Sequence, residues 1–349
     1  MLTAVLLAPI VYFASSATAD ASHVLVVINT ASSDSRSIGA YYRQKRNIPK
    51  DNVVTIDCSQ TENVSMDEFT YSILKPIQKA ARASKTRIDY IVMTKGIPIR
   101  LGDNGGAGTD AWLAVMNRDL RGISKLNEEE IRRCTSPYFE KKEHFDSSKF
   151  NMYLVTRLDG YTVEDAKALV DHAVAAKPVD GPFYLDEAEN RKTGGYGELQ
   201  GTMETAANIL RKAGKEAVVD KAPAFGNPGR AVMGYVSWGS NDGKFSESVY
   251  KSVKFLPGAI SETFVSTSGR TFKHTTGGQS LIADLIASGV TGVKGYVSEP
   301  YTFALARPDI LFDRYVSGFN LAESFYMASP VLKWKDVVIG DPLCNPYGS

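Results

Sequence analysis

Three loops in the second half of the chain carry side chains suited to chemistry. Each follows an apolar, β-branched segment that predicts a strand, at 231–238, 258–266 and 290–298. The loops combine hydroxyl, amide, carboxylate and guanidinium groups, which can bind a polar ligand or hold a nucleophile beside an acid/base partner. They read Ser237-Trp238-Gly239-Ser240-Asn241-Asp242, Ser266-Thr267-Ser268-Gly269-Arg270 and Ser298-Glu299-Pro300-Tyr301.

The expected roles follow from the side-chain types. Ser266 or Ser268 would supply the nucleophile or anchor the substrate, while Asn241 and backbone amides would polarise it. Trp238 and Tyr301 would act as aromatic stacking platforms. The predicted catalytic residues are Ser266, Glu299, Asp242 and His274, the last three as acid/base, and the predicted ligand-binding residues are Trp238, Ser240, Asn241, Ser268, Arg270 and Tyr301.

Two other interpretations of these loops stay open. Ser, Thr, Asn and Asp after a strand also form turns and helix N-caps that need no ligand. The carboxylates of Asp242, Glu299 and Asp103 would suit Ca²⁺ or Mg²⁺, which is a weaker alternative. The four histidines are scattered, and only His274 lies near these loops in the sequence. We predict neither a metal centre nor a cofactor.

Composition narrows the function classes. The chain has 349 residues, and 40 Lys plus Arg against 39 Asp plus Glu give a net charge of +1. A nucleic-acid-binding protein would normally show a basic excess, so we expect no nucleic-acid partner. With 43% hydrophobic and 23% charged residues the chain is not an acidic disordered protein, and three cysteines exclude a disulfide framework. The sequence has no P-loop, G-x-S-x-G or H-E-x-x-H motif.

The first residues predict a signal peptide. Residues 4–14 form an apolar run, and small residues ending in Ala17-Thr18-Ala19 follow, as at a secretory cleavage site. The run is shorter than the about 20 apolar residues that span a bilayer, so we expect no membrane span in the mature chain. We predict a signal peptide at 1–19 and export to the periplasm or the extracellular space. Because no Lys or Arg precedes the run, a buried N-terminal strand or helix is the alternative.

Strand and helix patterns alternate along the chain, which predicts an α/β fold. The strands are continuous apolar runs, so we expect a mostly parallel sheet with helices on both faces. Two side-by-side α/β subdomains, at 20–220 and 221–349, are compatible with this pattern. The predicted strands are 23–30, 52–57, 88–94, 151–157, 181–186, 216–220, 231–238, 258–266, 290–298 and 337–339. The predicted helices are 33–46, 65–83, 163–176, one ending at Gly214, 279–288 and two between 309 and 328.

A charged insertion at about 102–149 interrupts the alternation. Within it, 15 of the 33 residues at 117–149 are charged, eight basic and seven acidic. The favoured interpretation is a solvated helical excursion. The alternative is a lid or a partner-binding arm above the sheet edge.

The second half of the chain resembles the caspase-like cysteine peptidases of the gingipain type. A strand ends in a Gly/Ser turn at 235–242, the next runs into a nucleophile-type loop at 258–269, and a helix and a strand follow at 280–298. The closing segments are Gly318-Phe319-Asn320-Leu321-Ala322-Glu323 and Val338-Ile339-Gly340-Asp341-Pro342. The resemblance implies a caspase-like scaffold over most of the mature chain.

The whole chain also resembles an uncharacterised family of exported bacterial proteins. The stretches that carry this resemblance are Tyr42-Arg43 through Arg46-Asn47-Ile48-Pro49, 235–242, and Gly340-Asp341-Pro342-Leu343-Cys344. It implies export and no particular mechanism.

The His and Cys that follow two strands in gingipain-type enzymes have no counterpart here. The corresponding places hold Ser237-Trp238-Gly239 and Val265-Ser266-Thr267. An indole only donates a hydrogen bond, and Cys58, Cys134 and Cys344 all fall outside the nucleophile loop. Two functions are therefore expected: an exported hydrolase using the polar strand-end site, or a non-catalytic binding or assembly protein, a pseudo-peptidase. In the second case the rim would hold a peptide, a glycan or a protein partner.

Overall fold

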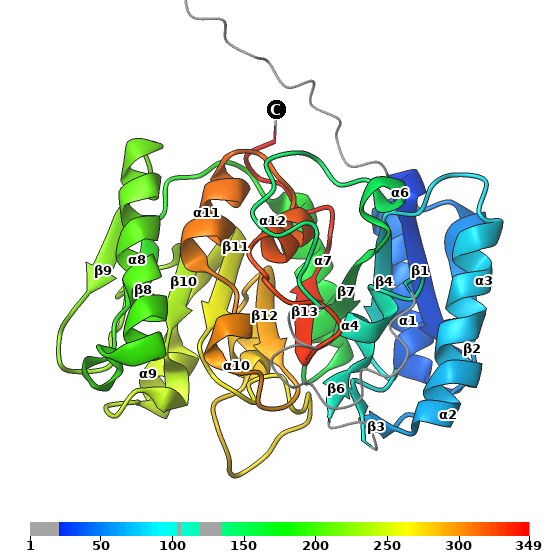
Figure 1. Ribbon diagram of the computed structural model, residues 1–349, viewed down its shortest axis with the longest axis horizontal. Helices are drawn as coiled ribbons and strands as arrows, with labels where there is room; N and C mark the ends of the chain where they lie inside the picture. Colours follow the sequence, from blue (N-terminus) through cyan, green and yellow to red (C-terminus); the bar gives the residue numbers. More distant parts are fainter. Residues whose placement is uncertain (1–20, 103–105, 119–133, 349) are drawn as a thin grey trace, which may run out of the picture.

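A sheet of ten strands runs through the computed structural model, which describes residues 21–102, 106–118 and 134–348 (Figure 1). The strands are β1 (Val24–Asn29), β2 (Val53–Ile56), β4 (Tyr90–Thr94), β7 (Leu154–Leu158), β8 (Phe183–Asp186), β9 (Ala217–Asp220), β10 (Val232–Ser237), β11 (Phe255–Thr263), β12 (Gly292–Tyr296) and β13 (Asp336–Gly340). Their order is β2-β1-β4-β7-β13-β12-β11-β10-β8-β9. The described pairs are parallel except β12 with β13, which is antiparallel.

Helices cover both faces of this sheet (Figure 1). On one face α1 (Ser33–Lys45) packs against α7 (Val163–Ala175), and on the other α11 (Pro308–Val316) packs against α8 (Gly194–Lys212) and α12 (Leu321–Met327). The remaining helices include α2 (Met66–Glu68), the π-helical η3 (Phe69–Leu74), α3 (Lys75–Ala83), α4 (Thr109–Leu113), α6 (Ser147–Phe150), α9 (Glu247–Ser252) and α10 (Ile282–Ala287). The predicted α/β class, with a mostly parallel sheet and helices on both faces, is confirmed.

The sheet has two parts that meet between β7 and β13. One part is β2-β1-β4-β7 and the other runs from β13 to β9, and a single residue pair, Ile339 with Arg157, joins them in register. β8 and β9 belong to the predicted first subdomain, because β9 ends at Asp220, but in the sheet they lie next to β10 of the second. The predicted boundary at 220 stays a prediction.

One strand near the predicted site differs from its predicted range, and a small second sheet was not predicted. β11 covers Phe255–Thr263 rather than 258–266, because its pairing with β10 ends at Ser237 and Thr263. Ser266 therefore lies in the following loop. A small sheet of β3 (Asn63–Val64), β5 (Arg100–Leu101) and β6 (Ala107–Gly108) was not predicted, since two-residue strands show no periodicity.

The charged insertion is described only in part. Residues 103–105 and 119–133 lie outside the described residues, as does the signal peptide predicted at 1–19. In the described part, Tyr138 packs against Phe145 and Phe150, and Arg314 of α11 donates hydrogen bonds to the carbonyls of Glu140 and Lys141. This part of the insertion is therefore joined to the core. The alternatives of solvated excursion and lid stay open for the rest.

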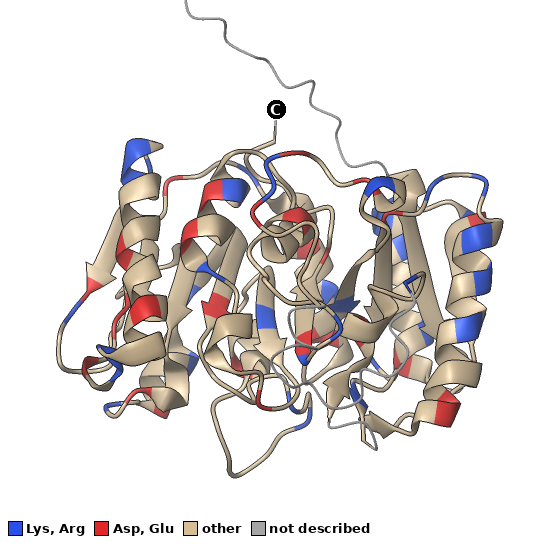
Figure 2. Cartoon of the chain, viewed as in Figure 1, with Lys and Arg blue, Asp and Glu red and all other residues tan. Residues whose placement is uncertain are grey.

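Charges of both signs are distributed over the elements that Figure 2 shows. Lys and Arg lie along α3, while α8 and α11 carry both acidic and basic residues. None of the described helices is long and apolar enough to cross a bilayer.

Candidate functional site

The loops after four neighbouring strands meet around one pocket. The strands are β12, β11, β10 and β8, which are adjacent in the sheet order, and the pocket has a volume of about 410 Å³. Carboxyl ends of parallel strands at one edge are where open α/β sheets bind ligands. From the predicted site the lining includes Trp238, Asn241, Ser266, Glu299 and Tyr301. We call this cavity, with Arg191, Tyr196, Thr302 and Phe303 also in its lining, the strand-end pocket.

The side chain of Asn241 links two of the loops that line the pocket. It ends η5 (Gly239–Asn241), and its side-chain amide donates to the carbonyl of Phe264 at 2.7 Å. Its side-chain oxygen accepts from Gln279 at 2.9 Å. Gly239 in the same turn has φ of 45°, and a Cβ there would lie 2.8 Å from Val265. The turn after β10 thus packs closely on the loop after β11, and the amide of Asn241 is committed to that contact.

Trp238 is part of the core rather than an exposed platform. Its side chain is 1% exposed, and the indole N–H donates to Gln200 at 2.8 Å. The Phe264 ring lies edge-on at a centroid distance of 4.9 Å. Replacing such a large buried side chain with Ala costs about 3–5 kcal/mol, so a Trp238→Ala variant would lose stability whether or not the pocket binds a ligand.

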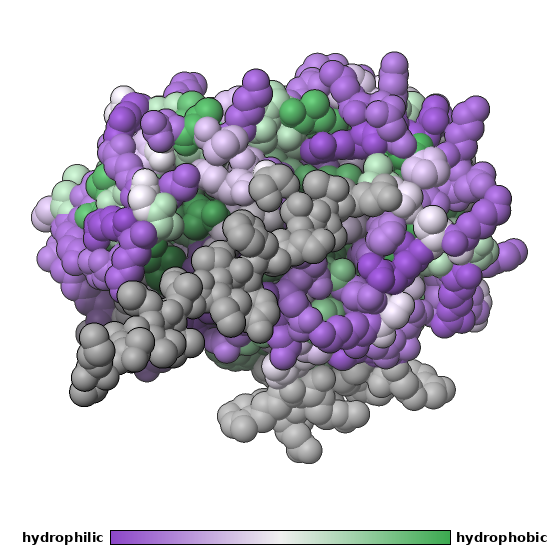
Figure 3. All heavy atoms as spheres, turned by 90° about the horizontal axis from the view of Figure 1, so that it is seen from above, coloured by the Kyte–Doolittle hydropathy of each residue, from purple (hydrophilic) through white to green (hydrophobic). Residues whose placement is uncertain are grey.

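Aromatic side chains gather at the mouth of the strand-end pocket. Four large aromatic side chains are exposed in the described part of the chain, and Tyr196, Tyr301 and Phe303 line this pocket at 46%, 51% and 48% exposure. The fourth, Tyr71, lies in η3. By contrast, the face at the amino ends of the parallel strands is mostly hydrophilic where Figure 3 shows described residues. Clustered exposed aromatics mark interaction sites.

The loop that carries two of these aromatics is held in a strained conformation. Tyr301 has φ of 68° and ψ of 149°, which is rare for a residue with a Cβ and costs of order 1–3 kcal/mol. The indole N–H of Trp334 donates to the carbonyl of Pro300 at 2.7 Å. The Tyr301 ring is nearly parallel to those of Trp334 and Phe303, at centroid distances of 6.2 and 5.7 Å. Packing thus places both aromatic side chains at the pocket.

Arg191 also lines the strand-end pocket. Its guanidinium donates to the carbonyl of Asn241 at 2.8 and 2.6 Å, and it lies over the rings of Tyr196 and Trp238, 4.7 and 5.4 Å from their centroids. Arg191, Tyr196 and Phe303 were not among the predicted site residues. The available signal was weak: Arg191 and Tyr196 follow the predicted strand at 181–186, and Tyr196 lies in a Gly-rich turn.

Ser266 and Glu299 line the strand-end pocket without a bonded acid/base partner. Among the described residues, no hydrogen bond joins the Ser266 hydroxyl to a histidine or a carboxylate. The predicted alternative base, His274, lies in a neighbouring pocket of about 430 Å³. There its ring stacks on Tyr161 at 4.0 Å. The structure thus brings Ser266 and Glu299 into one cavity and places His274 in another.

Three more predicted residues, and Arg270 besides them, lie outside the strand-end pocket's lining. Asp242 accepts from the backbone N–H of Lys244 at 2.7 Å, which is a turn contact. Ser240 accepts from the backbone N–H of Ser280 at 2.9 Å. Ser268 is fully buried. Only Asp242 has the geometry of the alternative turn interpretation. Ser240 joins two loops, and the Ser268 hydroxyl has no hydrogen-bond partner among the described residues.

Arg270 orders the loop after β11 and lines the same pocket as His274. Its guanidinium donates to the carbonyls of Gln279 at 2.6 Å and Gly277 at 2.7 Å. Burial lowers the pKa of Arg270. These donors are used to close the loop.

The metal alternative finds no support in the described residues. No group of three His, Cys, Asp or Glu side chains in the described ranges is arranged to hold a metal ion, and Asp103 lies outside them. Of Asp242 and Glu299, only Glu299 lines the strand-end pocket. Cys58, Cys134 and Cys344 are buried thiols, and no disulfide joins them.

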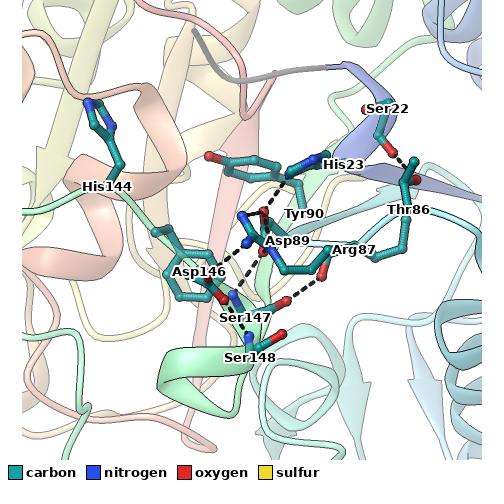
Figure 4. Close-up of polar contacts among 12 residues, drawn as sticks. Ser22, His23, Thr86, Arg87, Asp89, Tyr90, His144, Asp146, Ser147 and Ser148 are labelled. Carbon is teal, nitrogen blue, oxygen red and sulfur yellow. Dashed lines mark hydrogen bonds and ion pairs between the residues drawn. The ribbon is translucent and has the colours of Figure 1, made fainter. Parts of the chain in front are cut away.

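A second polar cluster lies where β1 and β4 begin (Figure 4). Asp89 is 2% exposed and contacts Nδ1 of His23 at 2.7 Å, Nη2 of Arg87 at 2.8 Å and the backbone N–H of Ser147 at 2.8 Å. These contacts join the start of β1 to the start of α6. We interpret the cluster as structural, since the Asp89 carboxylate is occupied by protein donors.

Comparisons with known proteins connect the fold to peptidases. No family model matches the sequence, and no curated protein matches it. A solved structure titled as that of a protease is 11% identical, with a TM-score of 0.53 over 93% of this chain and 78% of the other. A complex of the pro- and mature domains of RgpB from Porphyromonas gingivalis is 10% identical, with a TM-score of 0.48 over 92% and 79%. The likeness to the protease is one of overall fold, and the α/β sheet with helices on both faces is the architecture that the sequence resemblance implied.

Proposed function

We propose that this chain is an exported, non-catalytic binding protein built on a caspase-like peptidase scaffold. The observation that carries the proposal is the gathering of Tyr196, Tyr301 and Phe303, three of the four exposed aromatic side chains in the described ranges, in the strand-end pocket. Exposed aromatic side chains supply large contact areas for a ligand. Their position at the strand ends, where this class of fold binds ligands, supports a binding role.

The polar groups of the pocket favour binding over catalysis. A serine nucleophile needs a base within hydrogen-bond reach, and among the described residues Ser266 has none. The Asn241 amide, expected to polarise a substrate, donates to the carbonyl of Phe264. These contacts support a binding role for the strand-end pocket over a catalytic one.

The binding role can be tested by a thermal-shift screen against a mixed library of short peptides and oligosaccharides. We expect at least one ligand class to raise the Tm of the wild type, because a ligand that binds only the native state stabilises it. Phe303→Ala should lose that shift, since it removes a pocket ring. Tyr71→Ala, which removes an exposed ring outside the pocket, should keep it. Equal shifts for both variants would contradict the proposal.

A hydrolase is the second candidate, because Ser266 and Glu299 line the same pocket. The discriminating experiment is labelling with a serine-directed fluorophosphonate probe. A binding protein should not be labelled above the level of Ser266→Ala. Strong labelling that disappears in Ser266→Ala and persists in Ser268→Ala would establish the hydrolase instead.

Export rests on the sequence pattern at residues 1–19. The apolar run and the small residues before Asp20 support cleavage between Ala19 and Asp20. Expression of the full chain in a Gram-negative host should release a periplasmic or extracellular form whose intact mass begins at Asp20. A cytoplasmic product that keeps residues 1–19 would contradict export.

A further inference from the structure

The polar groups still available in the strand-end pocket are mainly hydroxyls. Among the described residues, no hydrogen bond joins the side-chain oxygens of Tyr196, Ser266, Tyr301 or Thr302 to another protein group. The same holds for the Glu299 carboxylate. Hydroxyls both donate and accept, and a carboxylate accepts, so the pocket suits a ligand that is rich in hydroxyl groups.

The formal charges of the strand-end pocket's lining cancel, because its charged residues are one cation, Arg191, and one anion, Glu299. The guanidinium of Arg191 donates to the Asn241 carbonyl and lies against two aromatic rings. Lys335 lies near Glu299. Burial lowers the pKa of Lys335, whereas the negative charge of Glu299 raises it. Lys335 itself lies over the ring of Trp334 at 4.4 Å. A neutral ligand fits this balance better than a charged one.

Three backbone carbonyls of residues that line the pocket are also occupied. The carbonyl of Phe264 accepts from Asn241, that of Pro300 from Trp334, and that of Asn241 from Arg191. An extended peptide gains affinity mainly by pairing its main chain with an exposed strand edge. With these acceptors used by side chains, the pocket disfavours a peptide.

We propose that the strand-end pocket binds a neutral saccharide. This inference rests on the proposed binding function and names its ligand class. A pyranose has an apolar C–H face for the rings of Phe303 and Tyr196, and hydroxyls that can donate to Glu299 and exchange hydrogen bonds with Ser266 and Thr302. The pocket volume of about 410 Å³ lies within the range of about 300–1,000 Å³ that is usual for small-molecule sites. It is therefore large enough for a sugar ring.

The test is isothermal titration calorimetry of the mature chain with neutral oligosaccharides of glucose, N-acetylglucosamine, mannose and galactose, from one to six rings. We expect the wild type to bind at least one series. Loss of the aromatic contact in Phe303→Ala should weaken that binding about tenfold, and Glu299→Gln should weaken it by a similar factor. Tyr71→Ala should bind like the wild type. Melting curves of all variants should match within a few degrees, since Phe303 is half exposed.

The outcomes separate the ligand class from the pocket itself. If no neutral oligosaccharide binds at millimolar concentration, the saccharide proposal is overturned. If a peptide from the thermal-shift library binds instead, and Phe303→Ala weakens its binding, the ligand class is wrong while the binding function stands. If an oligosaccharide binds equally to the wild type and to both pocket variants, the pocket is not its site, and the inference fails.

Discussion

At the residue scale, sequence stretches that carried the family resemblances prove to be in contact. Tyr42 and Arg46 lie in and just after α1, whereas Asp341 lies in the closing tail. The Asp341 carboxylate accepts from the Tyr42 hydroxyl at 2.9 Å, from Nε of Arg46 at 2.6 Å and from the Leu343 backbone N–H at 3.0 Å. Asp341 is fully buried. These residues therefore join the first helix to the end of the chain and lie outside the strand-end pocket.

Asp341→Ala should be among the most destabilising single substitutions. It leaves the Arg46 guanidinium, whose side chain is only 20% exposed, without its partner. Removing one partner of a buried pair costs about 3–5 kcal/mol. Urea unfolding measures the loss. Asp51→Ala is the matched control, because its ion pair with Lys85 is exposed on both sides and should contribute less than about 1 kcal/mol. Similar losses for the two variants would contradict a structural role for Asp341.

At the element scale, β11 and β12 carry polar groups into the covered centre of the sheet. Glu262 pairs in register with Lys294, and its carboxyl accepts from the Tyr296 hydroxyl at 2.8 Å. Burial, the largest cause, raises the pKa of Glu262 to about 8. The Tyr296 hydroxyl also accepts from the backbone N–H of Ala306 at 3.0 Å. This contact anchors the end of the loop that carries Tyr301 and Phe303.

The raised pKa of Glu262 predicts a loss of stability with rising pH. The unfolded chain releases this proton near pH 4.3 and the folded chain only near pH 8, so the unfolded state binds fewer protons between those values. The free energy of unfolding should therefore fall as pH rises across that window, by an amount on the order of a few kcal/mol, and level off above it. Urea unfolding from pH 5 to pH 9 measures the slope. Glu262→Gln should flatten it, and an unchanged slope in that variant would exclude Glu262 as the cause.

At the scale of the whole molecule, the two parts of the sheet share one core. One large cluster of buried hydrophobic side chains runs from Val24 of β1 to Cys344 of the tail, and a small second cluster contains Cys134, Ala304 and Val331. At the junction, the fully buried Arg157 donates to Asp110 at 2.6 and 3.0 Å and to the carbonyl of Ile97 at 2.7 Å. Arg157 also faces Ile339 across the seam between β7 and β13.

This shared core predicts that the chain unfolds as one cooperative unit. Differential scanning calorimetry should give a single transition whose calorimetric and van't Hoff enthalpies agree. Arg157→Met removes one partner of a buried pair and should lower the Tm of that transition without splitting it. Two resolved transitions in the wild type would show that the parts on either side of the seam unfold separately.

Much of the fold could be predicted because its signals are local. Each of the ten strands of the main sheet overlaps a predicted apolar run. Ser65 is the N-cap of the second predicted helix, whereas the first helix begins at Ser33 and has Ser32 as its N-cap. The antiparallel direction of β13 carried no such signal, since strand direction depends on pairing across the chain. The three strands of the small sheet were too short to show a period.

By itself, the sequence determined the alternation of strands and helices, the polar character of the loops after β10, β11 and β12, and the absence of a histidine and a cysteine at the ends of β10 and β11. Only the tertiary structure decided which of those loops share a cavity. The sheet order brings β8, with Arg191 and Tyr196 behind it, next to β10, and sequence spacing does not reveal that neighbour. The tertiary structure also decided which polar side chains bond to other protein groups, as Asn241, Arg270 and Asp242 do, and which line the pocket without such a bond, as Ser266 and Glu299 do. Packing, and not residue type, sets these hydrogen-bond partners.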